Sequence, residues 1–278
     1  MSPLRKLLRF FGKRSTGNTA CFLLNLDHTL QSTPGGGRMF YDAGRDLYYI
    51  NFSEDQRKFY CYHPYSLALR VRKRSVMERL TALGEEYSLD TFDVADGDVV
   101  IDVGANIGEV GMYYALVKER HVDYYAFEPM KKERQCCELN NPNGTIHRQA
   151  LWKENGKITF YQERGGRDDS SLIEPAHYDS VVEVETLTLE SFVEQHGIDK
   201  IKVLKLEAEG AEPEVLMGAQ GVLDRIQYIA ADLGSERGRD MAYTVPDVAN
   251  LLYSNGFKMT GMHHKRANNY LFRNTRFD

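Results

Sequence analysis

VVIDVGANIG, residues 99–108, is the most informative pattern in this 278-residue chain. Its β-branched first half predicts a buried strand that ends in an acid, Asp102, and a small-residue turn. The apolar spacing after Gly108 favours a helix. A strand, a glycine turn and a helix form the arrangement that binds a nucleotide-like ligand at the carboxyl end of a parallel sheet.

The turn residues indicate which ligand. Gly104 and Gly108 lack side chains where a ligand must approach the backbone, and the helix start offers N–H groups to a carboxylate. Asp102 would repel a pyrophosphate but can accept hydrogen bonds from an ammonium group, which favours S-adenosylmethionine (SAM) over NAD. The predicted cofactor-binding turn comprises Asp102, Gly104, Ala105, Asn106, Ile107 and Gly108.

A second acid follows at a strand end. Residues 124–129, YYAFEP, predict a strand that closes on Glu128 and Pro129. An acid about 20 residues beyond the glycine turn is suited to bind ribose hydroxyls. NAD enzymes share this acid, but the spacing Gly104-x-x-x-Gly108 differs from their G-x-G-x-x-G. Glu128 and Pro129 therefore join the predicted cofactor site.

The third informative segment is IKVLKLEAEGAEPEVLMGA, residues 201–219. With the two earlier segments it resembles the FkbM family of SAM-dependent methyltransferases, whose members pair I-D-V-G-A-N-x-G, F-E-P and K-[IL]-D-x-E-G-x-E in this order. The chain departs from the commonest pattern at Glu207, where Asp is usual. The resemblance covers roughly residues 90–260.

The expected fold is an α/β, doubly wound sheet with helices on both faces, because strands and helices alternate along the chain. The resemblance implies the class I methyltransferase (Rossmann-like) strand order, with one antiparallel strand. We expect a basic amphipathic segment and linker over 1–38, an α+β cap over 39–84 and a methyltransferase domain over 85–278.

The amino-terminal residues 4–14 predict a basic amphipathic helix. Its apolar face would hold Leu4, Leu7, Leu8 and Phe11, and the opposite face Arg5, Lys6, Arg9 and Lys13. Such a helix can lie on an anionic inner membrane surface, or it can fray or pack against another subunit. The stretch that follows, to Arg38, predicts a linker.

Residues 39–80 are rich in aromatic side chains and predict short strands and a helix from about Arg70 to Leu83. Aromatic and polar groups together can form a sugar-stacking surface. The same segment can equally serve as a cap that seals the edge of the sheet.

Beyond the second motif, residues 145–152 predict the third strand and its turn. Ala150 and Leu151 are expected near the adenine, where a cofactor pocket needs apolar contacts. The polar loop 163–172 suits a substrate contact or lid, or else a solvated hairpin tip. The resemblance implies that its Ser-Ser-Leu lies near the active site. The candidate substrate residues are Arg167, Ser170, Ser171, Glu212 and Arg237.

Methyl transfer requires in-line positioning of the acceptor and a route for its proton. The candidate catalytic residues are Glu207, Glu209 and Asp232, which lie at or after the ends of adjacent predicted strands. The motif favours Glu207 or Glu209 as the base, and clustered carboxylates can raise each other's pKa. A divalent ion held by these acids is the alternative, although no H-x-x-H spacing supports it. Lys205 is expected to be a buried partner of an acid.

Composition narrows the function classes. The net charge of −5 and a pI near 5.9 argue against nucleic acid as a partner. The four cysteines lack metal or disulfide spacing, and no apolar run approaches a membrane span, so we expect a cytoplasmic protein, with the inner membrane face left open. A homo-oligomer is left open too.

The predicted function is SAM-dependent O-methyl transfer to a hydroxyl of a sugar or glycan, with S-adenosylhomocysteine as product. Three alternatives stay open: an O-methyltransferase of polyketide-type natural products, a non-catalytic SAM-binding module and an NAD(P)-dependent oxidoreductase.

Overall fold

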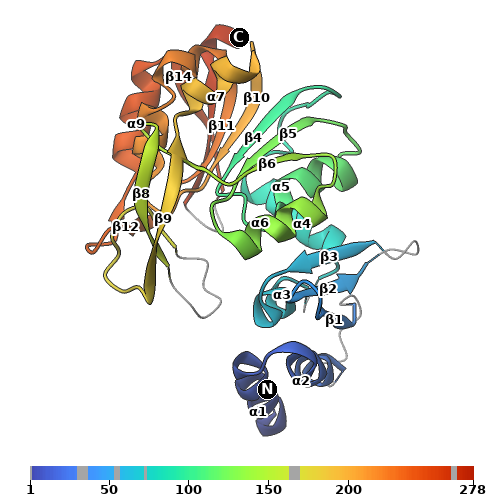
Figure 1. Ribbon diagram of the computed structural model, residues 1–278. Helices are drawn as coiled ribbons and strands as arrows, with labels where there is room; N and C mark the ends of the chain where they lie inside the picture. Colours follow the sequence, from blue (N-terminus) through green and yellow to red (C-terminus); the bar gives the residue numbers. More distant parts are fainter. Residues whose placement is uncertain (1, 30–36, 53–56, 72–73, 163–169, 264–267) are drawn as a thin grey trace.

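The computed structural model describes residues 2–29, 37–52, 57–71, 74–162, 170–263 and 268–278. A seven-stranded sheet runs through its centre (Figure 1). In spatial order the strands are β14 (Phe257–Met262), β15 (Asn269–Asn274), β11 (Ile226–Asp232), β10 (Ile201–Leu206), β4 (Val99–Val103), β5 (Asp123–Phe127) and β6 (Thr145–His147).

β15 is antiparallel to both of its neighbours, β14 and β11, and all other neighbouring strands of this sheet are parallel. This confirms the predicted doubly wound fold and the class I strand order with one antiparallel strand. The strand order reverses between β4 and β10, which is where ligands bind in such sheets.

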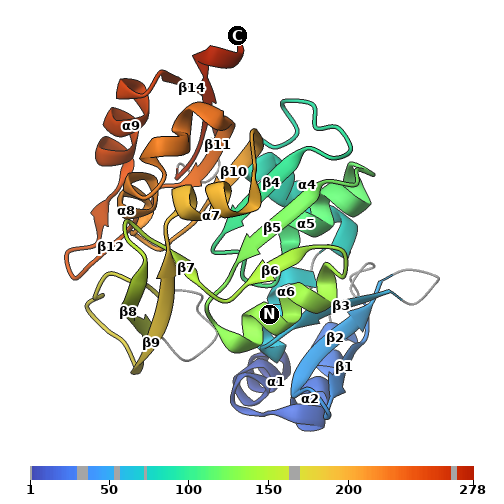
Figure 2. The same cartoon turned by 45° about the horizontal axis from the view of Figure 1, so that its top comes forward.

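Helices cover both faces of the sheet, as Figure 2 shows. One face packs against α7 (Leu189–His196), α8 (Glu212–Met217), the 3₁₀ helix η2 (Gln220–Arg225) and α9 (Val245–Ser254). The other packs against α4 (Val76–Glu86), α5 (Glu109–Met112), the π-helical turn η1 (Tyr113–Val117) and α6 (Lys131–Asn140). A last 3₁₀ turn, η3 (Thr275–Phe277), follows β15.

A small sheet lies beside the carboxyl edge of the main one. Its strands, in the order β7-β9-β8, are β7 (Ala150–Leu151), β9 (Ser180–Leu187) and β8 (Gly156–Gln162). The strand and turn predicted over 145–152 are present as β6 and the bend after it; the prediction did not include β7, which pairs with β9. A two-stranded hairpin, β12 (Ser235–Arg237) and β13 (Ala242–Tyr243), follows β11.

The cap consists of an antiparallel meander and helices. Its strands are β1 (Met39–Asp42), β2 (Leu47–Asn51) and β3 (Lys58–Cys61). The single helix predicted from Arg70 to Leu83 was wrong: α3 (Pro64–Val71) is a separate helix, and α4 starts at its own capping box, in which Ser75 and Glu78 bond each other's backbone N–H.

Two further helices precede the cap, α1 (Pro3–Arg14) and α2 (Gly17–Thr29). The helix over 4–14 is confirmed, whereas the linker predicted to Arg38 was wrong over residues 17–29. The apolar residues Ala20 and Leu24 of α2 are buried against the cap and α1. This burial stabilises α2 although its sequence is only weakly amphipathic. None of the helices in the described ranges has the length and apolarity that a membrane crossing needs.

Candidate functional site

A cavity of about 750 Å³ opens where β4, β5, β10 and β11 end. The predicted cofactor residues that line it are Asp102, Gly104, Ala105, Asn106, Glu128, Pro129, Ala150 and Leu151. The predicted catalytic residues Glu207, Glu209 and Asp232 line it as well, together with Ser170. The volume fits a ligand the size of a nucleoside with an acceptor beside it.

The turn after β4 depends on glycine for reasons of packing. Gly104 has φ +68°, and a Cβ there would lie 1.9 Å from the backbone oxygen of Glu207. Gly108 has φ +82°, and a Cβ there would lie 2.1 Å from Nδ2 of Asn141. Atoms of the protein itself therefore require glycine at both positions, a packing reason in addition to the approach of a ligand that the sequence suggested. Gly108 and the fully buried Ile107 do not line the cavity.

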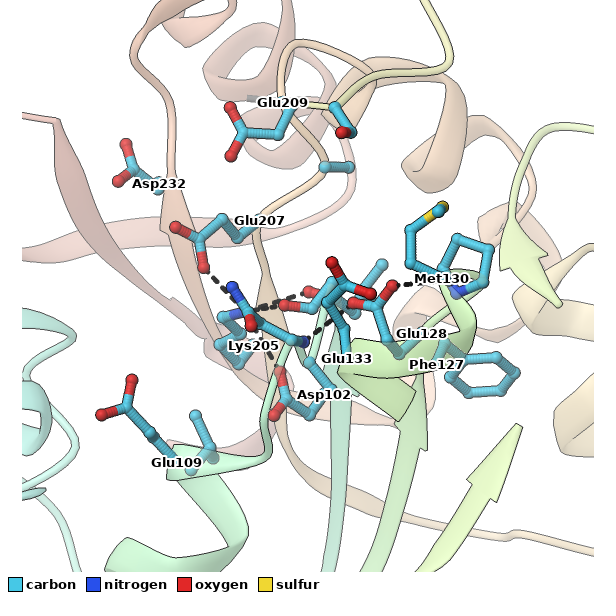
Figure 3. A pocket seen from close by; sticks show the side chains of 18 of the residues that line it. Asp102, Glu109, Phe127, Glu128, Met130, Glu133, Lys205, Glu207, Glu209 and Asp232 are labelled. Atoms are coloured by element: carbon cyan, nitrogen blue, oxygen red, sulfur yellow. Dashed lines mark hydrogen bonds and ion pairs between the residues drawn. The ribbon is translucent and has the colours of Figure 1, made fainter. Parts of the chain in front are cut away.

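Lys205 is the centre of a buried charge network at the base of the cavity (Figure 3). Its Nζ lies 3.1 Å from Oδ1 of Asp102 and 2.9 Å from Oε2 of Glu207, and it donates to the carbonyl oxygens of Val103 and Gly104. Burial lowers the pKa of Lys205, but the two carboxylates outweigh burial and the net shift is upward. Its predicted role as a buried partner of an acid is confirmed.

Asp102 and Glu207 respond differently to this network. Asp102 is fully buried and also accepts a 2.6 Å hydrogen bond from the Tyr124 hydroxyl. Burial raises its pKa despite Lys205, and a ligand ammonium would share this carboxylate with Lys205. Burial alone would raise the pKa of Glu207, but Lys205 and the Tyr87 hydroxyl hold it below its ordinary value.

Asp232 differs from both. It ends β11, directly across from Asn269 on β15. Its Oδ1 is buried and has no hydrogen-bond partner among the described residues, and the same holds for Oδ1 of Asn269. Burial and the charges of Glu207 and Glu212 raise the pKa of Asp232 to about 6. The pair offers acceptor oxygens to a ligand that carries hydroxyl or amino donors.

Glu128 is held by the backbone at the end of β5. Its Oε2 accepts from the N–H of Asn106 at 2.9 Å and its Oε1 from the N–H of Met130 at 2.8 Å. Burial, with help from Glu133, raises the pKa of Glu128 to about 8. Each oxygen keeps a second lone pair for a ligand hydroxyl. Oδ1 of Asn106 is buried and unpartnered among the described residues, so it is a further acceptor.

The cap supplies part of the cavity wall, which sequence reasoning did not assign. The cap residues in the wall are Tyr62, His63, Arg70, Arg79 and Leu83, and Glu86 and Tyr87 line it from the residues directly after the cap. Arg70 and Arg79 both bind the buried Glu109 of α5, at 2.7 and 2.9 Å. Burial raises the pKa of Glu109, but these arginines outweigh it and lower the pKa to about 2. The sequence feature that could have indicated Tyr62 and His63 is the aromatic segment over residues 39–80, which suits contacts with a sugar.

Other predicted substrate residues stand outside the cavity wall. Ser171 is buried and donates to the backbone oxygen of Glu209 at 2.7 Å. Glu212 accepts from the N–H groups of Ala208 and Gly210, so it braces the acidic turn. Arg237 forms a two-pronged ion pair with Glu214. Arg167 lies outside the described residues. Ser171, Glu212 and Arg237 thus support the shape of the site and do not line it.

Metal binding has no built site in the described part of the chain, where no group of three or more His, Cys, Asp or Glu side chains is arranged to hold an ion. Asp102 and Glu207 instead pair with Lys205, Glu128 accepts hydrogen bonds from backbone N–H groups, and Glu109 pairs with two arginines.

The strand order and the cavity at its switch point define a class I methyltransferase fold. The family model for the methyltransferase FkbM domain matches residues 102–259, which is more than half of the chain. The protein therefore belongs to the FkbM methyltransferase family, as the three motifs predicted.

Three curated proteins are similar to part of this chain. The 2-O-methyltransferase NoeI of Sinorhizobium fredii is 22% identical over 50% of this chain and 64% of its own length. The 31-O-demethyl-FK506 methyltransferase FkbM of Streptomyces tacrolimicus is 27% identical over 59% of this chain and 74% of its own. The hexuronic acid methyltransferase AglP of Haloferax volcanii is 24% identical over 51% of this chain and 58% of its own.

Among solved structures, the methyltransferase FkbM from Methylobacillus flagellatus has a TM-score of 0.47 and 15% identity, with 70% of this chain and 50% of that chain covered. The protein thus spans about half to three quarters of the length of the proteins it matches.

Proposed function

We propose that the protein is a SAM-dependent O-methyltransferase whose acceptor is a sugar hydroxyl, free, nucleotide-linked or part of a glycan. The observation that carries this proposal is the pair of unpartnered buried oxygens on Asp232 and Asn269, beside Glu207 and inside the cavity. Buried acceptors without donors cost free energy unless a ligand supplies the donors. A polyol has such donors on neighbouring carbons.

The β4–β5 half of the cavity suits the cofactor. Glu128 is positioned for ribose hydroxyls by its two backbone hydrogen bonds, and the Asn106 side chain faces the same wall with an unpartnered oxygen. Ala150 and Leu151 add apolar contacts for the adenine ring of the cofactor. When bound, SAM supplies a methyl group on a sulfonium, which an acceptor oxygen attacks in line.

Asp232 is the base that we favour. Its carboxylate would take the proton of the acceptor hydroxyl as the methyl group moves from the sulfonium sulfur to the acceptor oxygen, leaving S-adenosylhomocysteine, and a pKa of about 6 leaves Asp232 ionised yet basic at neutral pH. Glu207 is a weaker base because its ion pair with Lys205 stabilises the charged form. We assign Glu207 to orienting the acceptor, and Glu209 to the rim of the cavity.

Sugar chemistry is supported by the aromatic cap residues in the wall and by the similarity to AglP, which is named a hexuronic acid methyltransferase. The alternative acceptor is a natural product, because the chain is also similar to the 31-O-demethyl-FK506 methyltransferase FkbM of S. tacrolimicus. Cytoplasmic location, oligomeric state and the three-part domain division stay predictions.

The first test is calorimetric titration with S-adenosylhomocysteine beside NADH. We expect micromolar binding of S-adenosylhomocysteine alone, weakened by Glu128→Ala and unchanged in Glu138→Ala, a half-exposed acid on α6. Binding of NADH instead would favour the oxidoreductase.

Transfer of labelled methyl to uronic acids, hexoses and nucleotide sugars then tests the acceptor class. Binding without transfer to any acceptor, macrolides included, would favour the non-catalytic module.

A further inference from the structure

The α1–α2 hairpin, the blue helices at the bottom of Figure 1, has its charges and its apolar residues in an unusual arrangement. Nε of Arg5 and Nε of Arg9 each lie 2.9 Å from an oxygen of Asp27, which is fully buried. Leu8 and Gly12 share this inward side of α1, and Gly12 packs against Leu24. The arginines therefore hold the helix to the protein.

The outward side of α1 is apolar instead. Leu4, Leu7 and Phe11 follow one another at helical spacing, and each is about half exposed, at 53%, 53% and 50%. Phe10 borders them at 49%. The predicted apolar face thus survives without Leu8, but it points away from the protein. Burying such side chains is favourable, so this face requires a partner.

The rim of this face is positively charged. Lys6, Lys13 and Arg14 are exposed, and the guanidinium of Arg14 stacks over the Phe10 ring at 3.8 Å. No acid occurs in α1, and the nearby Asp27 is neutralised by its two arginines. The whole chain carries −5, so this local positive charge is opposite in sign to the rest.

We propose that α1 lies in the surface of an anionic phospholipid bilayer, with Leu4, Leu7 and Phe11 at the boundary of headgroups and acyl chains. The lysines and Arg14 then meet lipid phosphates at the level where a half-buried helix presents its edges. A second copy of the same face is a poorer partner, because pairing two such faces brings like charges together with no acid on α1 to offset them.

The proposal explains why Arg5 and Arg9 point inward. If they pointed outward they would compete with the apolar stripe for the same surface, and only the packing of Leu8 and Gly12 would fix the helix orientation on the protein. Bound to the buried Asp27, they fix which face is presented. The membrane contact is therefore preorganised, with little ordering entropy lost on binding.

The test is flotation of the full chain with vesicles of phosphatidylcholine containing phosphatidylglycerol, beside vesicles of phosphatidylcholine alone. We expect binding to the anionic vesicles, with a marked loss in high salt because the charges are exposed. The double variant F11S/L7S should bind about tenfold less tightly or weaker still, since two apolar anchors are removed.

The matched control is V181S/Y253S, which removes an aliphatic and an aromatic side chain of similar exposure, 51% and 50%, from β9 and α9. Circular dichroism must show that both double variants are folded. Equal binding of the wild type and F11S/L7S, or no flotation of the wild type, would overturn the proposal. A wild-type dimer that F11S/L7S converts to monomer, without vesicle binding, would assign the face to a second copy.

Discussion

The two halves of the cavity place their carboxylates in different settings. At β4 and β5, each oxygen of Asp102 and Glu128 lies against a protein donor or cation: Asp102 has the Tyr124 hydrogen bond on Oδ2 and only the Lys205 ion pair on Oδ1, and Glu128 has two backbone N–H groups. At β11 and β15, Asp232 and Asn269 each keep a buried oxygen without a partner in the described residues. We call the first half saturated, because its carboxylates are held by protein partners and fix the shape of the cavity. We call the second half unsaturated, because its side chains keep an oxygen that can accept a hydrogen bond from a ligand.

This difference separates binding from chemistry. Glu128 is fixed by two backbone N–H groups in the half assigned to the cofactor, so it is a rigid hydrogen-bond platform there even though burial raises its pKa to about 8. Asp232, with a pKa near 6, can take up a proton close to neutrality. Glu207 stands between the two groups, because it lines the cavity but shares Lys205 with Asp102.

The largest expected effect comes from removing the unsaturated acid. Asp232→Asn keeps the shape and loses the base, so we expect the methyl transfer rate to fall by about 10²–10⁴ while S-adenosylhomocysteine binding is unchanged. In the wild type, kcat/KM should rise with pH through about 6, because Asp232 must be ionised to accept the proton. The variant should lose this rise. Steady-state rates with labelled SAM from pH 5 to 8 measure both.

Glu236 provides the control for that profile, because its own raised pKa depends partly on the charge of Asp232. Glu236→Gln should keep the rise near pH 6 with little shift, because the pKa of Glu236 is raised to about 7 and its carboxyl is largely protonated where Asp232 titrates. A rise near pH 6 that persists in Asp232→Asn would assign the base to another group.

The saturated half is best tested through stability. Lys205→Met leaves Asp102 buried without its cation, which we expect to cost about 3–5 kcal/mol in the free energy of unfolding. Adding Asp102→Asn should recover part of this loss. Lys157→Met is the matched control, because Lys157 pairs with Glu183 at 2.6 Å on the exposed surface of β8 and β9. That pair should contribute less than about 1 kcal/mol. Equal losses in urea titrations would contradict the network.

A third, smaller effect concerns the turn between the halves. Gly108→Ala must accept φ +82° and an overlap with Asn141, so we expect about 2–4 kcal/mol of destabilisation. Because Gly108 does not line the cavity, S-adenosylhomocysteine affinity of the folded fraction should change little. Weak binding by a fully folded variant would support the interpretation that Gly108 also clears space for the ligand. Urea titration and calorimetry on the same sample separate the two.

The parts of the site that could be predicted from the sequence are those that depend on short contiguous patterns. The strand ends at Asp102, Glu128 and Asp232 follow from apolar runs that stop at an acid, and parallel strands bring such ends together. The cap wall could not be predicted, because Arg70 and Arg79 reach Glu109 through a contact between segments 30 to 39 residues apart. Helix α2 was missed because its pattern is weakly amphipathic.

Single-sequence reasoning also cannot rank similar acids. Glu212 and Glu209 have equal places in the motif, yet one braces a turn from a buried position and the other lines the cavity. Which lone pairs are already occupied is a tertiary property, and it decides between a structural acid and a ligand contact.

The smallest effect should come from Glu207→Asp, which restores the residue commonest in the family pattern. The shorter side chain retreats by one methylene from Lys205, now at 2.9 Å, and from the Tyr87 hydroxyl. Lys205 keeps Asp102 and two backbone carbonyls, so the network stays intact. If Glu207 only orients the acceptor, the transfer rate should change by less than about tenfold, chiefly in the KM for the acceptor. A loss in kcat as large as that of Asp232→Asn would instead place the proton transfer on Glu207, and the two halves of the cavity would then share the chemistry.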